Sequence, residues 1–272
     1  MRQSILAGPL FCFILLLTGC ATIEGPTDPN DPFESYNRAM FTFNDKLDQY
    51  VLKPVAKGYD AVTPDPVQKG VNNFFSNLDD VIVIVNDLLQ FKLTQFASDT
   101  GRLIINSTVG IFGLIDWASD IGLEKHNEDF GQTLGYWGVP SGPYFVLPFL
   151  GPNTIRDTGG LTVDSTYLDP IYKELHEEFP PPRRSNETAI WTMTTLKAVD
   201  TRAKLLQAEA IMEEAALDRY IFIREAYLQK RKSLVYDGYP PQEQLDFDET
   251  FLFEDEPRDA DTPAPKQEDS VQ

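Results

Sequence analysis

The stretch DPFESYNRAMFTFNDKLDQY, residues 31–50, carries the pattern that decides the fold. Asp31 can cap a helix, Pro32 suits its first position, and Glu34 can complete a capping box. Beyond them, large apolar and aromatic side chains recur at steps of three and four residues, at Phe33, Tyr36, Met40, Phe43, Leu47 and Tyr50. The stretch therefore predicts an amphipathic helix with one broad aromatic face.

The rest of the chain predicts more helices with similar start signals. Proline follows a polar residue at Lys53-Pro54 and at Asp65-Pro66, and each pair marks a helix start. The β-branched run 81–85 favours a strand on propensity alone, but aspartates at 79 and 80 can cap it and residues 86–90 continue a helical pattern. We also predict helices over residues 95–106, 115–121, 188–206, 205–216 and 219–236, so the body should be all-α.

Residues 131–160 have a different composition. Glycines and prolines are interleaved there with large aromatic side chains. Since proline removes backbone donors and glycine adds flexibility, regular structure is expected to break in this segment. The segment is too apolar for a solvated loop, so we expect it to be buried or to lie against lipid.

The N-terminus resembles a bacterial lipoprotein signal. Arg2 precedes an apolar run over residues 5–17, and Leu17-Thr18-Gly19-Cys20 then matches a lipobox. We predict that residues 1–19 are removed and that Cys20 receives a diacylglyceride thioether and an N-terminal acyl chain. Ala21 in the next position favours the outer membrane, and residues 20–30 would form a tether. The alternative is an ordinary secretory signal with a coincidental cysteine.

Composition excludes several classes of function. Cys12 would leave with the signal and Cys20 would become the anchor, so no disulfide, thiol redox centre or cysteine metal site is expected. The formal charge is −19, and residues 238–272 form an acidic stretch that we predict to be disordered, either as a solubilising tail or as a docking segment. A chain this acidic is a poor nucleic-acid binder and is not drawn to anionic lipid.

Signals for catalysis are weak. His126 and His176 are the only histidines and lack paired-ligand spacing, so ordinary surface histidines are favoured over a zinc site. Ser141 lacks the glycine two residues before it that a nucleophile elbow needs, and no phosphate-binding loop is present. We therefore expect no enzyme activity, no metal and no cofactor.

Several stretches, taken in order, resemble one family. They are DPFESYNR (31–38), FTFNDKLD (41–48), KPVA (53–56), NFFSNL (73–78), NDLLQ (86–90), DFGQTLG (129–135), GPY (142–144) with LP (147–148), and RD (156–157). From the tether to about Tyr236 the chain is similar to the VacJ/MlaA phospholipid-transport lipoproteins. The corresponding domain is expected over residues 31–237.

The resemblance implies a ring-shaped, mostly helical protein in the inner leaflet of the Gram-negative outer membrane, on its periplasmic face. Such a protein would remove mislocalised phospholipids from the outer leaflet through a central channel and so maintain lipid asymmetry. Implied partners are phospholipids, a trimeric porin and the soluble periplasmic lipid shuttle of the Mla system, which delivers lipid to an inner-membrane ABC transporter.

The resemblance also implies site residues. Residues 106–122 match the family's channel-flanking hairpin, with Gly110 and Gly113 as hinges, although an ordinary tight turn is the alternative. The first-helix stretch is expected near this hairpin. The implied residues are Asn106, Gly110, Phe112, Gly113 and Asp116 in the hairpin, Phe41, Phe43 and Asn44 in the first helix, and Cys20 for lipidation.

Other hypotheses remain open from the residues alone. The aromatic helix faces could lie in one leaflet or could pack a soluble core. An outer-membrane scaffold that does not transport lipid is a second possible function. An envelope hydrolase is a third.

Overall fold

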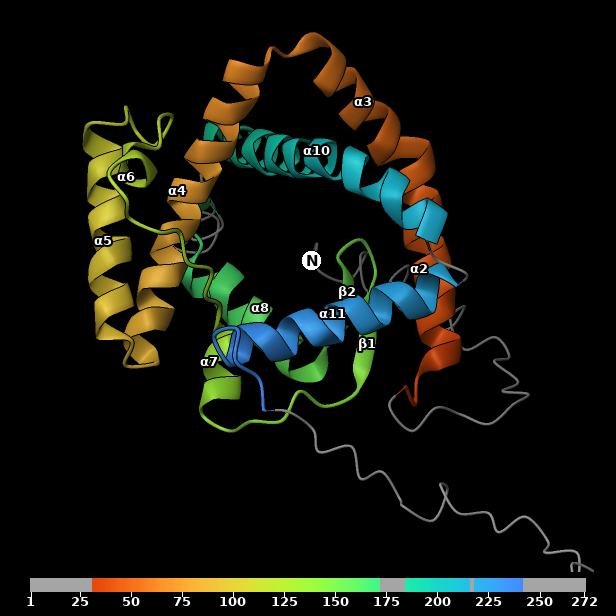
Figure 1. The fold of residues 1–272 in the computed structure, drawn as a ribbon. Coiled ribbons are helices and arrows are strands. Elements are labelled where there is room, and N and C mark those ends of the chain that lie inside the picture. The colour runs from red at the N-terminus through yellow and green to blue at the C-terminus, as the bar shows by residue number, and fades with distance from the viewer. Residues whose placement is uncertain (1–30, 172–183, 216–217, 242–272) are drawn as a thin grey trace, which may run out of the picture. The chain divides into compact units, whose positions relative to one another are not determined.

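The structure of this chain is a computed structural model that describes residues 31–171, 184–215 and 218–241. Residues up to Pro240 form one compact unit. As predicted, the described part is mostly helical (Figure 1). Its helices are α2 (Glu34–Leu47), the π-helical turn η1 (Asp48–Leu52), α3 (Lys53–Val62), α4 (Asp65–Leu89), α5 (Leu93–Thr108), α6 (Trp117–Asp120), α7 (Phe130–Tyr136), α8 (Ile155–Val163), the π-helical turn η2 (Asp164–Leu168), α10 (Arg184–Ala215) and α11 (Arg219–Val235).

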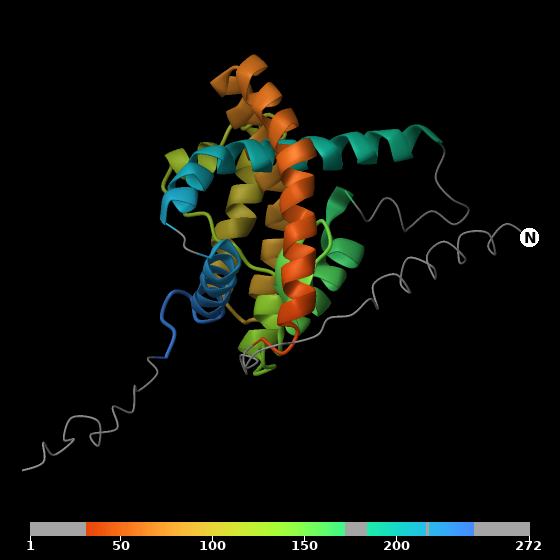
Figure 2. The same ribbon diagram turned by 90° about the vertical axis from the view of Figure 1, so that its right-hand side faces the viewer.

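Helices α2, η1 and α3 follow one another as one long curved arm, seen side-on in Figure 2. The predicted capping box at its start is wrong, since the N-cap position is Phe33 and no side chain caps the helix. Asp31 is instead buried and accepts hydrogen bonds from Asn37, 2.7 Å away, and from Tyr220. Asp31 therefore joins the start of the arm to α11, a partner that no local pattern reveals.

The predicted helix over the β-branched run is confirmed, because residues 81–85 lie inside α4. Helix α4 starts with Pro66 in its first turn and packs along α5, which covers the predicted helix 95–106. The predicted helix 115–121 is present as the single turn α6.

The expectation of irregular structure over residues 131–160 is only partly correct. The segment contains α7, the start of α8, and two antiparallel strands, β1 (Tyr144–Leu147) and β2 (Gly151–Thr154). Pro152 is tolerated because it lies in a two-stranded ribbon, where one edge of each strand is unpaired. Gly151 begins β2 with a φ of 82° and supplies the backbone that the turn requires.

The two helices predicted over residues 188–206 and 205–216 form one helix, α10. Its sequence contains neither glycine nor proline, so nothing interrupts it. The last predicted helix is confirmed as α11.

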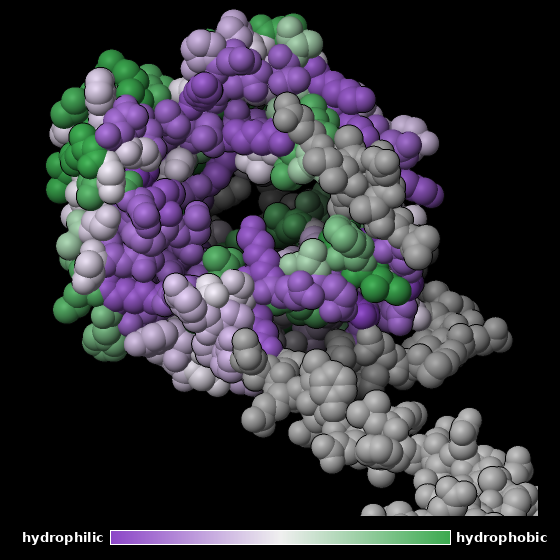
Figure 3. Space-filling view, viewed as in Figure 1, coloured by the Kyte–Doolittle hydropathy of each residue, from purple (hydrophilic) through white to green (hydrophobic). Residues whose placement is uncertain are grey.

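Contacts between elements close a ring within this unit. The arm packs through α3 against α10, α10 packs against α4, and α4 contacts α7. Helix α7 packs against α8 and α11, α11 contacts β2, and the two strands return to α2. Figure 1 shows these elements around a central opening, and the face shown in Figure 3 is hollowed at the same place.

Polar side chains dominate the interior. Among the described residues, 20 buried side chains are polar or charged and only 11 are hydrophobic. Two small apolar clusters hold the ring together, one around Phe75, Ile171 and Ile190 and the other around Tyr144, Val146 and Tyr220. Since buried polar groups and exposed apolar patches are the informative departures from ordinary folding, this inversion is the main clue to function.

Within the described residues, no helix has the length and apolar character needed to cross a membrane.

Candidate functional site

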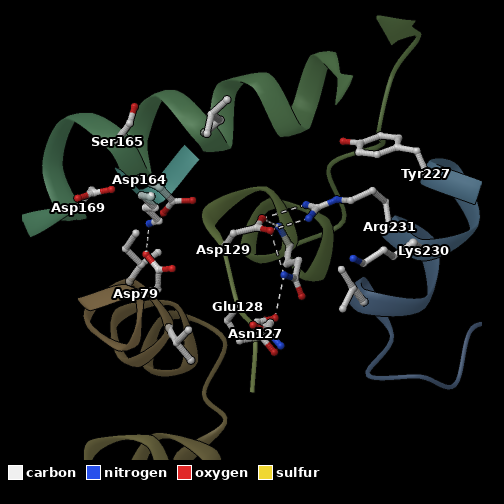
Figure 4. Close-up of a pocket in the computed structure, with 16 residues that line it drawn as sticks. Asp79, Asn127, Glu128, Asp129, Asp164, Ser165, Asp169, Tyr227, Lys230 and Arg231 are labelled. Carbon is white, nitrogen blue, oxygen red and sulfur yellow. Dashed lines mark hydrogen bonds and ion pairs between the residues drawn. The ribbon is translucent and has the colours of Figure 1, made fainter. Parts of the chain in front are cut away.

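A cavity of about 630 Å³, lined by many polar side chains and by Ile82, Val83, Leu161 and Leu234, lies inside the ring, where α4, α10, α8, η2, α11 and the residues around the start of α7 approach one another (Figure 4). Asp79 and Lys197 stand on the α4 and α10 sides, and Lys230 and Arg231 come from α11. The other polar lining residues are Asn127, Glu128, Asp129, Gln132, Asp164, Ser165, Asp169 and Tyr227.

Arg231 organises the wall between α7, α8 and α11. Its guanidinium donates to Asp129 at 2.5 and 2.9 Å and to Asp157 at 2.9 and 3.0 Å. The helices can meet here because of glycine: a Cβ on Gly160 would lie 2.2 Å from the Gly131 nitrogen. Asp129 also caps α7 by accepting the Gln132 N–H at 2.8 Å, so local sequence and long-range ion pairs fix the same carboxylate.

The electrostatics divide the carboxylates of this wall into two kinds. Burial acts to raise the pKa of Asp129 and of Asp157, but hydrogen bonds and ion pairing with Arg231 outweigh it and lower both. Burial raises the pKa of Asp164 to about 6, although this carboxylate accepts from the Phe130 N–H at 2.8 Å and the Asn86 amide at 3.3 Å, its hydrogen-bond donors within the described residues. Asp164 therefore lacks the strong cationic partner that Asp129 has.

The hairpin that follows α5 has a polar base. Asn106 is buried, donates to Asp116 at 2.8 Å and accepts the Ala118 N–H at 3.0 Å. Arg102 donates to both oxygens of Asp116 at 3.1 Å, and Asp116 caps α6. Burial opposes ionisation of Asp116, but the hydrogen bonds from Ser119, from Asn106 and the Arg102 charge lower its pKa to about 2. Of the predicted hairpin residues, the structure therefore brings Asn106 and Asp116 into direct contact.

The hairpin tip is strained and closely packed. Ile111 and Phe112 have φ values of 53° and 57°, which large side chains rarely adopt. A Cβ on Gly110 would lie 2.2 Å from the Ile115 carbonyl oxygen, and one on Gly113 would lie 2.6 Å from the Asn77 Cβ. Both glycines have N–H groups that donate to backbone carbonyls. Hinge motion at these glycines stays a prediction, and proline there would also remove a hydrogen bond.

The outer surface of this region is apolar. Phe112 is 76% exposed, and neighbouring hydrophobic side chains of α5, the hairpin and α6 are exposed with it: Ile104, Val109, Ile111, Leu114, Ile115, Trp117 and Ile121. We call this set the α5–α6 apolar face. In Figure 3 hydrophobic side chains gather over α5 and α6, while the rim of the central hollow is mostly hydrophilic.

The first-helix stretch does not lie beside the hairpin, and that expectation is wrong. Asn44 donates to the Leu147 carbonyl at 2.9 Å and accepts the Phe149 N–H at 2.8 Å, and the Phe43 ring meets Phe149 edge-on. Phe41 packs edge-on against Tyr220. In Figure 1 α2 and the α5–α6 pair stand on opposite sides of the ring.

Asn37 is the residue that sequence reasoning missed in this helix. It is buried, donates to the Tyr144 carbonyl at 3.2 Å and accepts the Val146 N–H at 2.9 Å. Asn37 and Asn44 are seven residues apart, and this spacing puts two backbone-pairing amides on the same face of α2. That spacing was readable in the sequence.

The candidates for catalysis gain no geometric support. His126 contacts Asp99, with 2.8 Å between Nδ1 and Oδ2, and no group of metal-ligating side chains forms among the residues that the structure describes. No hydrogen bond of the described part links the Ser141 hydroxyl to a base. Cys20 and His176 lie outside the described residues.

Comparison with known proteins places the chain in a family. The family model described as MlaA lipoprotein matches residues 29–234. The chain belongs to the MlaA family. An Escherichia coli (strain K12) member, named intermembrane phospholipid transport system lipoprotein MlaA, is 35% identical over 240 residues, covering 84% of this chain and 88% of the relative. A Haemophilus influenzae protein of the same name is 33% identical over 233 residues, covering 82% and 88%.

A solved structure supports membership of the MlaA family at the level of the fold. This solved structure is described as "Structural basis for maintenance of bacterial outer membrane lipid asymmetry". It aligns with the present chain with a TM-score of 0.63 and 33% sequence identity, and the alignment covers 75% of this chain and 98% of the other. The family resemblance and the helical fold predicted from the sequence are thus confirmed.

Proposed function

We propose that this MlaA-family chain is a lipid-anchored protein of the outer membrane that removes phospholipids from the outer leaflet and passes them to a soluble periplasmic shuttle. The family name and the names of its relatives support phospholipid transport as the general role. The lipobox at Cys20 supports the anchor. A porin trimer is the proposed neighbour in the membrane.

The observation that carries this proposal is the inverted distribution of polarity. A phospholipid that crosses a bilayer unaided must take a charged headgroup through hydrocarbon, which costs several kcal/mol or more. A polar opening lowers that barrier, and an apolar exterior lets the opening sit among acyl chains. The ring of this chain has both properties, with charged groups around the cavity and the α5–α6 apolar face outside.

Release from the membrane is the second barrier. Exposing acyl chains to water costs about 0.8 kcal/mol per CH₂ group, so a free lipid does not leave at a useful rate. A shuttle with an apolar pocket that meets the opening avoids this exposure. The proposed mechanism therefore consists of binding and transfer, and it breaks no covalent bond.

The test is surface-restricted labelling of phospholipid on intact cells. Deleting the gene should raise outer-leaflet phospholipid, and the wild-type gene should restore the normal level. A scaffold would leave surface phospholipid unchanged while disturbing its protein partners. A hydrolase would instead change the amounts of lysophospholipid and free fatty acid.

A further inference from the structure

The cavity inside the ring contains charges of both signs that the protein does not neutralise. Two of its cations have acidic partners, since Arg231 pairs with Asp129 at 2.5 Å and Lys197 pairs with Asp79 at 2.5 Å. Lys230 is exposed and makes no hydrogen bond or ion pair with any residue that the structure describes. Its ammonium is therefore available to an anion in the cavity.

Two carboxylates on the far side of the cavity form no ion pair with any described residue. Within that part of the chain Asp164 accepts hydrogen bonds only from a backbone N–H and a side-chain amide. Asp169 is 8% exposed and accepts the Ile171 N–H at 2.7 Å, again a neutral donor. Figure 4 shows these two aspartates across the cavity from Lys230.

A buried amide on the same wall has an unused hydrogen-bond acceptor. Gln132 is 2% exposed and lines the cavity, yet its Oε1 atom accepts no hydrogen bond in the described part of the chain. An unsatisfied buried acceptor costs about 1–3 kcal/mol. Because this oxygen is itself closed to the cavity, a bound N–H donor would reach it only after a shift of the Gln132 side chain.

We propose that this cavity binds the headgroup of zwitterionic phospholipids, with the phosphate near Lys230 and the ammonium near Asp164 and Asp169. This inference rests on the proposed transport function and specifies its substrate. The pairing explains why one ammonium and two carboxylates at opposite sides of a cavity form no ion pair with any residue that the structure describes. It also predicts discrimination, because an anionic headgroup such as phosphatidylglycerol offers no cation to the two carboxylates.

The test is a competition between two lipids with identical acyl chains. Full-length lipidated protein in a neutral detergent is incubated with equal amounts of isotope-labelled phosphatidylethanolamine and phosphatidylglycerol, and captured lipid is quantified by mass spectrometry. We expect wild type to enrich phosphatidylethanolamine on the order of fivefold, which corresponds to about 1 kcal/mol.

Two variants separate the charges, and two more serve as controls. The double variant Asp164→Asn, Asp169→Asn should bring the ratio close to one while the total bound lipid changes little. Lys230→Gln lies on an exposed helix position, so it should fold normally and lower the total bound lipid, with little change in the ratio, because both lipids carry the phosphate. Lys57→Gln and Asp120→Asn change exposed charges on α3 and α6, away from the cavity lining, and should behave as wild type.

The outcomes separate the two proposals. Binding of both lipids at equal levels by wild type, or a ratio unaffected by Asp164→Asn with Asp169→Asn, overturns the headgroup assignment and leaves transport standing. Capture of no phospholipid above the level of an unrelated lipoprotein, together with normal surface phospholipid in the deletion strain, overturns the proposed transport function itself. If the double variant does not fold, Lys230→Gln decides alone: total bound lipid equal to wild type contradicts the site.

Discussion

Asp87 and Asp99 form a fully buried carboxyl pair that makes the stability of this protein depend on pH. Both residues are 0% exposed, and neither oxygen of Asp87 nor Oδ1 of Asp99 receives a hydrogen bond from any described donor. Two carboxylates cannot face each other in this way unless one of them carries a proton. Burial, the charge of Asp99 and a hydrogen bond with Asp99 accordingly raise the pKa of Asp87 to about 8.

The sign of the effect follows from linkage. In the unfolded chain Asp87 ionises near its ordinary pKa, so the folded state holds the extra proton. The stabilisation that this proton gives is complete below pH ~4 and is lost as the pH rises through about 8. One proton changes the free energy of unfolding by about 1.4 kcal/mol per pH unit, so up to about 3 kcal/mol is lost between pH 6 and pH 8.

Asp87→Asn tests this reasoning, because its amide can donate to Asp99 without taking up a proton. The free energy of unfolding is measured in detergent at several pH values for both proteins. As the pH rises from 6 to 8, the free energy of unfolding of the variant, relative to that of wild type, should increase by about 2–3 kcal/mol. Asp79→Asn removes a partly exposed carboxylate from the same helix and should keep the wild-type slope. Parallel pH profiles for Asp87→Asn and wild type would refute the shared proton.

Three other variants test how the ring is held and how it meets lipid. Gly160→Ala should lower the free energy of unfolding by at least about 2 kcal/mol, because its Cβ would lie 2.2 Å from the Gly131 nitrogen. Its control is Gly159→Ala, whose Cβ would have nothing within 4 Å and which should be neutral or stabilising in thermal unfolding. Arg231→Met should cost about 2–3 kcal/mol in the same assay, because it removes the guanidinium that pairs with half-buried Asp129 and with buried Asp157. Phe112→Asn should keep thermal stability, since asparagine tolerates a φ of 57°. In a vesicle sedimentation assay of the chain from Ala21 onward, it should weaken the free energy of vesicle binding by about 1–2 kcal/mol, because Phe112 is 76% exposed. Binding equal to wild type would show that the α5–α6 apolar face does not enter lipid.

The elements that sequence patterns predicted are those with local causes. Helix α4 begins at Asp65-Pro66 and continues through a β-branched run, because its start signal and its helical period agree. The β1–β2 ribbon was missed, since glycine and proline within it mimic a loop, and its stability comes from Asn37 and Asn44 on a distant helix. Residues brought together across the ring, such as Asp129 and Arg231, 102 positions apart, have no local signature at all.

Hydropathy periodicity also cannot say what an apolar face touches, because a protein core and a lipid leaflet are both apolar environments. The first helix shows this clearly: Tyr50 of its predicted aromatic face is 73% exposed, whereas Asn37 is fully buried. The helical period was predicted correctly, but the period does not show which face of the helix is buried. The hydrogen bonds of the polar side chains decide which face is buried, since a buried amide or carboxylate requires partners that only the folded ring supplies. For this ring, the polar residues repeated along the amphipathic helices are therefore the better guide to the interior, and the aromatic residues are the better guide to the exposed apolar surface.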